Sequence, residues 1–230
     1  MQYRHELKFR ITQADVARLD TRLSGILQTD SHIENGAYTV RSLYFDDLYD
    51  TCLEEVLSGV DMRRKFRIRL YNGSADRICL EKKSKRRGMT RKESEVLTLR
   101  DCLAYMDGLP LAGDGPVSRE LFAAMLQRGM RPRCIVEYER RAYVEAAGNV
   151  RVTLDMDIRG TADTGQFLAP LCRDMTCVLP EGMHILEVKY DEFLPDVIAQ
   201  QLEIGKLRKT AFSKYYLGRL AIRGEFPIER

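Results

Sequence analysis

The segment that most constrains the fold is a basic stretch at residues 62–92, which holds thirteen Lys and Arg residues against two acids. Residues 63–71 alternate: one face carries Arg63, Lys65, Arg67, Arg69 and Tyr71, and the other carries Phe66, Ile68 and Leu70. This period of two predicts a β-strand with one charged face and one packed face. A turn at residues 72–74 and a second strand over residues 77–84 complete a hairpin whose polar side is cationic.

The same polarity recurs in segments far apart along the chain. Further strands are predicted over residues 3–11, 38–46, 88–99, 133–144, 150–160 and 183–190, the fifth of these alternating without interruption. Their polar faces carry Lys or Arg with a carboxylate close by, as in Lys8 with Glu6 and Lys189 with Glu187. Cations set side by side on an open sheet would repel one another. Strands that are charged inside and apolar outside instead close into a barrel with a polar lumen.

Helical patterns occur between these strands. They are predicted over residues 13–27, 50–58, 101–108, 117–128, 194–203 and 213–223, while residues 30–37 and 161–182 are predicted loops. We therefore expect a single α+β domain over residues 1–230. Its core would be an antiparallel β-barrel of about eight strands that forms a polar tunnel, with helices packed on the outside.

Composition narrows the cellular setting. The six cysteines form no CxxC pair, which is typical of reduced thiols in a cytoplasmic protein. No apolar run approaches the roughly 18 residues of a membrane-spanning helix. The net charge is only +3, so the cationic character is local rather than global.

A set of segments in a fixed order resembles a known family. RHELKF, SLYFD, KFRIRLY, LEKK, YERRAY, RVTLDMDI, ILEVKY and FSKYYLG follow one another as in the polyphosphate polymerase domain of the vacuolar transporter chaperone (VTC) type. That family belongs to the triphosphate tunnel metalloenzymes. The resemblance implies transfer of the terminal phosphoryl group of ATP to a growing inorganic polyphosphate chain. It also implies a divalent metal, Mn²⁺ or alternatively Mg²⁺, and a membrane-protein partner acting in trans if the chain is complete.

The resemblance assigns roles to individual residues. The phosphate-gripping catalytic residues would be Arg67, Arg69, Lys83, Arg140, Arg151 and Lys189. Substrate would also be bound by Lys8, Lys92 and Lys214, and Glu187 would bind the metal. The strand pattern leaves open whether Arg140 or Arg141, and Lys92 or Arg91, faces the tunnel. Ala211 stands where the family often has a lysine, which Lys209 or Lys206 could replace.

The sequence also suggests positions for other charged residues. Asp155 and Asp157 would share one face of their strand, where they bind metal or orient arginines. Glu6 resembles part of the ExExK strand of related tunnel triphosphatases, with Arg4 in place of the partner acid. A set of basic residues in the hairpin would lie at the rim or in solvent: Lys82, Lys85, Arg86 and Arg87.

Two other functions remain compatible with the sequence. A hydrolase of the same architecture would cleave tripolyphosphate or a nucleoside triphosphate, and a non-catalytic module would only bind polyphosphate. Nucleic-acid binding is disfavoured, because Phe66 and Tyr71 fall on opposite faces of the basic hairpin and form no stacking platform. The chain also lacks the GxxxxGK[ST] motif of P-loop enzymes.

Overall fold

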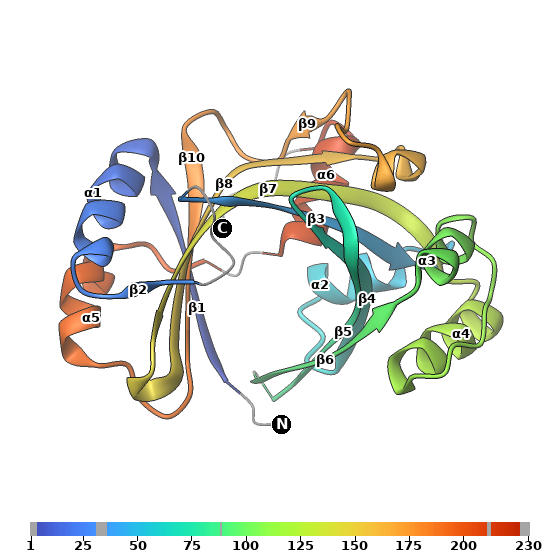
Figure 1. Cartoon of the computed structure of the whole chain (residues 1–230), viewed down its shortest axis with the longest axis horizontal. Helices are drawn as coiled ribbons and strands as arrows, with labels where there is room; N and C mark the ends of the chain where they lie inside the picture. The colour runs from blue at the N-terminus through green and yellow to red at the C-terminus, as the bar shows by residue number, and fades with distance from the viewer. Residues whose placement is uncertain (1–3, 31–35, 88, 211–212, 226–230) are drawn as a thin grey trace.

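The computed structural model describes residues 4–30, 36–87, 89–210 and 213–225. One antiparallel sheet curls around a central space, and helices flank it on two sides (Figure 1). The strands are β1 (His5–Thr12), β2 (Gln28–Thr29), β3 (Tyr38–Asp46), β4 (Arg63–Tyr71), β5 (Ser74–Arg86), β6 (Met89–Leu97), β7 (Arg131–Glu145), β8 (Val150–Thr161), β9 (Thr176–Cys177) and β10 (Met183–Tyr190). The helices are α1 (Gln13–Ser24), α2 (Thr51–Leu57), α3 (Leu99–Met106), α4 (Pro116–Arg128), α5 (Asp196–Leu202) and α6 (Lys214–Ile222).

Eight strands form the sheet in the order β1-β10-β8-β7-β3-β4-β5-β6, and the short strands β2 and β9 pair with β7 and β8. Every pair is antiparallel. Among the described residues, the two edge strands meet in an isolated bridge between Arg4 and Thr90. The predicted fold class, an α+β chain built on an eight-stranded curled antiparallel sheet, is confirmed.

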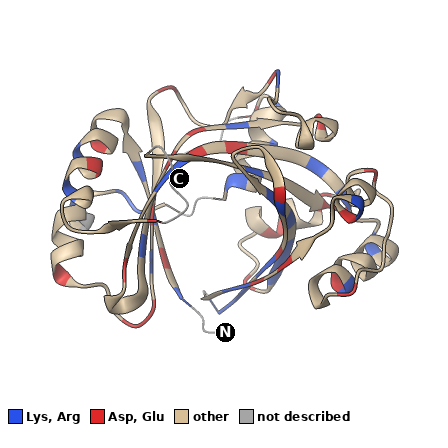
Figure 2. Ribbon diagram, in the orientation of Figure 1, with Lys and Arg blue, Asp and Glu red and all other residues tan. Residues whose placement is uncertain are grey.

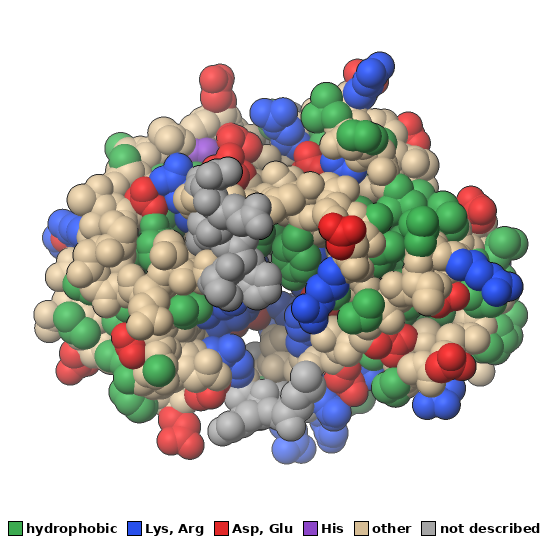
Figure 3. All heavy atoms as spheres, viewed as in Figure 1, with side chains coloured by type: hydrophobic (Ala, Val, Ile, Leu, Met, Phe, Trp, Pro, Cys, Tyr) green, Lys and Arg blue, Asp and Glu red, His purple; other side chains and the backbone are tan. Residues whose placement is uncertain are grey.

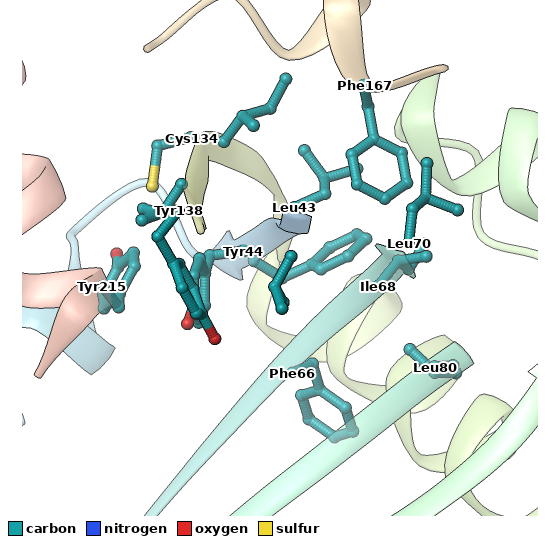
Figure 4. Close-up of a cluster of buried hydrophobic side chains, with 14 of the residues drawn as sticks. Leu43, Tyr44, Phe66, Ile68, Leu70, Leu80, Cys134, Tyr138, Phe167 and Tyr215 are labelled. Carbon is teal, nitrogen blue, oxygen red and sulfur yellow. The ribbon is translucent and has the colours of Figure 1, made fainter. Parts of the chain in front are cut away.

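The apolar faces of the strands point outward, where helices cover them. On one side, Leu43, Ile68 and Leu80 of β3, β4 and β5 belong to a core shared with α3 and α4 (Figure 4). On the other side, Phe9 and Leu186 of β1 and β10 belong to a core shared with α1 and α5. Burial of these faces directs the alternate, charged positions toward the central space, because successive side chains of a strand point to opposite faces.

Helix α6 packs against β7 and β8 and also contacts α2. Its Gly218 comes so close to β7 that an added Cβ would lie 2.7 Å from a methyl group of Val136. Tyr215 of α6 places its ring 5.3 Å from that of Tyr44 on β3. Val136 shares the alternation of the inward-facing Tyr138 and Arg140, so α6 covers part of the charged face rather than the apolar one.

Asp46 at the end of β3 joins three elements. Its carboxylate accepts hydrogen bonds from the backbone N–H groups of Cys52 (2.9 Å) and Leu53 (3.1 Å) in α2. It also accepts the hydroxyl of Tyr215 in α6. The carboxylate is fully buried, so these donors replace the water that it loses on folding. The segment SLYFD therefore fixes both helices relative to the sheet.

The predicted alternation of β8 is interrupted. Asp157 has a positive φ of 48°, and the register with β7 shifts beside it. This is a β-bulge, in which an extra residue changes which side chains share a face. As a result Asp155 is buried on the inner face while Asp157 is exposed, so the prediction that both share one face is wrong.

Smaller differences concern loops. The predicted loop at residues 161–182 contains a 3-10 helix (Thr164–Leu168) and the short strand β9. Residue 3 of the first predicted strand and residues 31–35 of the predicted loop at 30–37 lie outside the described residues. No helix in the described part of the chain is long and apolar enough to cross a membrane.

The close packing of α6 predicts the effect of a larger residue at its contact with β7. Gly218→Val should lower the free energy of unfolding by about 2 kcal/mol, because the added methyl groups meet Val136 in a packed interface. Gly205→Ala is the matched control, since an added Cβ there meets nothing within 4 Å. Urea unfolding of both variants measures the difference. A Gly218→Val protein as stable as the control would contradict this packing.

Candidate functional site

The inward face of the sheet carries charged side chains from most of its strands. Figure 2 shows Lys and Arg along the strands on both sides of the central space, and Figure 3 shows cationic side chains around a hollow. The structure brings all the predicted site residues to this face: Lys8, Arg67, Arg69, Lys83, Lys92, Arg140, Arg151, Glu187, Lys189 and Lys214. A smaller set of carboxylates lies between their cationic groups and forms ion pairs with them.

The first carboxylate is Glu81 on β5, which lies opposite Arg67 in the register of the hairpin. Its oxygens lie 2.7 Å from Arg67, 2.7 Å from Lys92 and 3.6 Å from Arg69. Burial would raise the pKa of Glu81, but Arg67, Arg69 and Lys92 together hold its pKa far below the usual range. The carboxylate therefore stays ionised and fixes three cations around it.

A second group surrounds Asp155 on β8. Arg140 on β7 donates two hydrogen bonds to it, at 2.6 and 2.8 Å, in the bidentate geometry that favours guanidinium–carboxylate pairing. Lys214 from α6 approaches the same carboxylate at 2.6 Å. Burial opposes the ionisation of Asp155, yet Arg140 and Lys214 lower its pKa. Helix α6 thus delivers a cation to the sheet.

Glu187 on β10 and Glu6 on β1 form the third group. Their carboxyl groups lie close enough to influence each other's pKa, and like charges in such proximity repel. Lys189 lies 2.6 Å from Glu187, and Lys8 lies 3.0 Å from Glu6. Burial would raise the pKa of Glu187, but Lys189 and Lys8 hold its pKa well below the ordinary value. A pair of adjacent carboxylates is thus kept anionic.

This pair fits a divalent cation by the chemistry of its donors. Carboxylate oxygens are hard ligands, and Mg²⁺ in phosphate-transfer sites is held by one or two carboxylates together with substrate phosphates. The described residues include no group of three or more His, Cys, Asp or Glu side chains placed to hold a metal ion. A metal at Glu187 and Glu6 would therefore take further ligands from phosphate oxygens and water.

Tyrosines complete the face, and the sequence analysis missed them. The hydroxyl of Tyr44 accepts a hydrogen bond from Arg67 at 3.1 Å, and that of Tyr38 accepts one from Arg151 at 3.0 Å. The ring of Tyr138 lies 4.8 Å from the Lys214 ammonium, within range of a cation–π contact. Tyr38 and Tyr44 lie an even number of positions apart along β3, so their side chains are expected on the same face. This spacing was visible in the sequence.

The structure also decides the alternatives that the sequence left open. Arg140 faces inward, whereas Arg141 pairs with Asp20 of α1 on the outside. Lys92 faces inward to Glu81, whereas Arg91 pairs with Glu93.

Of the possible replacements for Ala211, Lys206 is 77% exposed and pairs with Glu203. Lys209 forms an isolated bridge with Phe9. Residue 211 itself lies outside the described residues.

One assignment within the basic hairpin is wrong. Lys82 was expected at the rim or in solvent, but it is buried and lies 2.7 Å from Glu93 and 2.5 Å from Glu120. Glu120 belongs to α4, which covers the outer face of the hairpin at this point. Local sequence could not show this burial, because the covering helix lies far along the chain.

Comparison with known proteins identifies the family. The sequence profile of the VTC domain matches residues 3–222, nearly the whole chain. The chain belongs to the VTC domain family. A comparison with curated proteins gives no match.

Solved structures with the same fold include HpAC1 from Hippeastrum, reported with a dominant triphosphatase activity. It is 14% identical with a TM-score of 0.57, and the match covers 99% of this chain and 98% of that one. A candidate adenylate cyclase from Bacillus halodurans is 12% identical with a TM-score of 0.51, and the match covers 100% of this chain and 95% of that one. At these sequence identities, the two comparisons show a shared fold and nothing more.

The cluster around Glu81 predicts a pH-dependent loss of stability. Glu81→Gln leaves Arg67, Arg69 and Lys92 without their shared counter-charge and should cost about 3 kcal/mol at pH 7. Because the pKa is lowered in the folded state, the carboxylate stabilises the fold above its unfolded pKa of about 4.3 and loses this effect as the pH falls further.

The difference between wild type and Glu81→Gln should therefore shrink below about pH 4. Urea unfolding over a pH series measures it. The control is Glu139→Gln, the same substitution on the outward face of β7. It should be nearly neutral, since surface changes shift stability by about 0.5 kcal/mol or less. A deficit that stays constant down to low pH would show that Glu81 does not act through its charge.

Proposed function

We propose that this VTC domain is a metal-dependent polyphosphate polymerase, which transfers the terminal phosphoryl group of ATP to a growing inorganic polyphosphate chain. The observation that carries the proposal is the inward cationic face, in which Arg and Lys from seven strands and α6 surround a few ionised carboxylates. Such a face suits an extended polyanion, because successive phosphates need successive cations.

The residues of this face supply what phosphoryl transfer requires. The reaction depends mainly on positioning and on neutralising charge, and it needs no protein nucleophile. Arg67 and Arg69 would grip the nucleotide phosphates by paired hydrogen bonds, with Lys83, Arg140, Arg151 and Lys189 completing the cradle. Lys8, Lys92 and Lys214 would align the end of the polyphosphate chain with the phosphoryl group that it attacks.

Glu187, with Glu6 beside it, would hold the divalent metal, Mn²⁺ or Mg²⁺. A bound metal of this kind neutralises charge on phosphate oxygens. The surrounding residues prepare this position: Lys8 and Lys189 keep both carboxylates ionised in the free protein. The same proposal allows a membrane-protein partner in trans that receives the product.

A second candidate, triphosphate hydrolysis, is favoured by one comparison. HpAC1 shares the fold and is reported with a dominant triphosphatase activity. On the same cationic face, water would take the place of the polyphosphate acceptor. The two reactions differ only in the acceptor of the phosphoryl group, so their products distinguish them.

Incubation with ATP and Mn²⁺ tests the proposal directly. Polymerase activity should give long polyphosphate on a gel, together with ADP in equal amount to the phosphate incorporated. Release of free phosphate without polymer would establish the hydrolase instead. Tight binding of polyphosphate without turnover, in Mn²⁺ or Mg²⁺, would leave only a binding module.

In the same assay, Glu187→Gln should reduce turnover by at least about a hundredfold, because metal binding and charge placement are both weakened. Glu139→Gln on the outward face is the matched control and should retain full activity. Circular dichroism verifies that both proteins are folded. A folded Glu187→Gln protein with normal turnover would remove Glu187 from the metal site.

A further inference from the structure

Lys65 on β4 differs from the other cations of the inward face. Its ammonium donates a hydrogen bond to the hydroxyl of Ser213 at 3.2 Å and lies 5.2 Å from the centre of the Tyr215 ring. Among the described residues, it forms no ion pair with a carboxylate. The other inward cations share Glu6, Asp30, Glu81, Asp155 or Glu187 as counter-charges.

The groups around Lys65 are mostly cationic. Lys83 is its direct partner in the β4–β5 register, and Arg63 and Lys8 are also near enough to repel its charge. The acidic groups that interact electrostatically with Lys65, without forming an ion pair, are Cys52 and Glu55 of α2 and Cys134 of β7. Burial lowers the pKa of Lys65 to about 7, and repulsion from Arg63, Lys83 and Lys8 acts in the same direction.

A partly buried cation without a counter-charge destabilises a folded protein. Two of the three ammonium hydrogens of Lys65 are left for another acceptor once Ser213 has taken one. Ser213 accepts hydrogen bonds from Lys65 and from the backbone N–H of Tyr216, which leaves its own hydroxyl hydrogen to donate. The two side chains thus present donors that a phosphate oxygen would satisfy.

We propose that Lys65 and Ser213 form an additional phosphate subsite at the α6 end of the inward face, which binds one phosphoryl group of a polyphosphate or triphosphate. This inference rests on the proposed function, since it takes a phosphate chain as its ligand. Lys65 stands two residues before Arg67 on the same strand, about 7 Å away along it. It would therefore hold a phosphate group other than the one held by Arg67.

Binding of sodium tripolyphosphate to the whole chain, measured by calorimetry, tests the subsite without any turnover. Lys65→Met should bind on the order of tenfold more weakly, as expected for the loss of one charge-assisted hydrogen-bonding group, whereas Lys65→Arg should stay close to wild type. Arg64→Gln is the matched control. Arg64 is adjacent in sequence, but its side chain is 66% exposed and approaches Glu120 of α4 on the outer face.

Two further readouts separate binding from a structural role. Without ligand, Lys65→Met should be at least as thermally stable as wild type, because an uncompensated charge is removed; a structural lysine would give a loss. At pH 8, wild type should take up more protons on binding tripolyphosphate than Lys65→Met does, because a bound phosphate raises the pKa of Lys65. Calorimetry in buffers of different ionisation enthalpy measures this uptake.

Ser213→Ala keeps Lys65 and provides a second test of the subsite if Lys65→Met does not fold. This variant should bind tripolyphosphate about threefold more weakly than wild type. Wild-type affinity in Lys65→Met, or in Ser213→Ala where only that variant folds, would overturn the subsite and leave the proposed function intact. A wild-type protein that binds neither tripolyphosphate nor ATP would overturn both.

Discussion

The structure depends on the electrostatic balance inside its curled sheet. Cations from several strands face one another there, and burial makes each of them costly unless an opposite charge lies beside it. Glu81 and Asp155 each hold more than one cation, so a few acids compensate many bases. Among the described residues, Lys65 of this face forms no ion pair with a carboxylate. An anionic chain would supply such a partner, which links the stability of the lumen to its proposed ligand.

The outer layer makes this inward face possible. Apolar positions alternate with the charged ones along the strands. The apolar side chains are buried under α1 and α5 on one side and under α3 and α4 on the other, so the charged side chains point inward. Helix α6 instead packs on the inward face of the sheet. Asp46 anchors it through Tyr215, and the same helix carries Lys214 to Asp155. An element late in the chain therefore completes a site whose other residues come from the sheet.

Much of the fold could be predicted because it follows from local periodicity. The strands at residues 38–46 and 183–190 have the predicted bounds, and the strict alternation around Arg67 placed its charged side correctly. The bulge at Asp157 could not be predicted, because an extra residue in a strand leaves the alternation of the sequence unchanged. The burial of Lys82 depends on Glu93 and on Glu120 of α4, a contact that only tertiary packing creates.

The site was predicted in the same uneven way. Ordered family motifs predicted a set of cations that the structure places on the inward face, but they did not reveal which carboxylate pairs with each cation. Glu6 and Glu187 come close where β1 pairs with β10, and Lys65 lies where β4 meets the start of α6. Such juxtapositions have no signature in any one segment. They become visible only when the register of neighbouring strands is known, as in the pairing of Lys65 with Lys83.

Lysine footprinting with tripolyphosphate examines most directly whether the inward face binds phosphate chains. Burial lowers the pKa of Lys83 to about 8, so a sizeable neutral fraction reacts with an acylating reagent near that pH. Bound tripolyphosphate should strongly slow the acylation of Lys83, read by mass spectrometry, while the exposed Lys206 reacts at an unchanged rate. Unaltered acylation of Lys83 at saturating tripolyphosphate would place the binding surface elsewhere on the molecule.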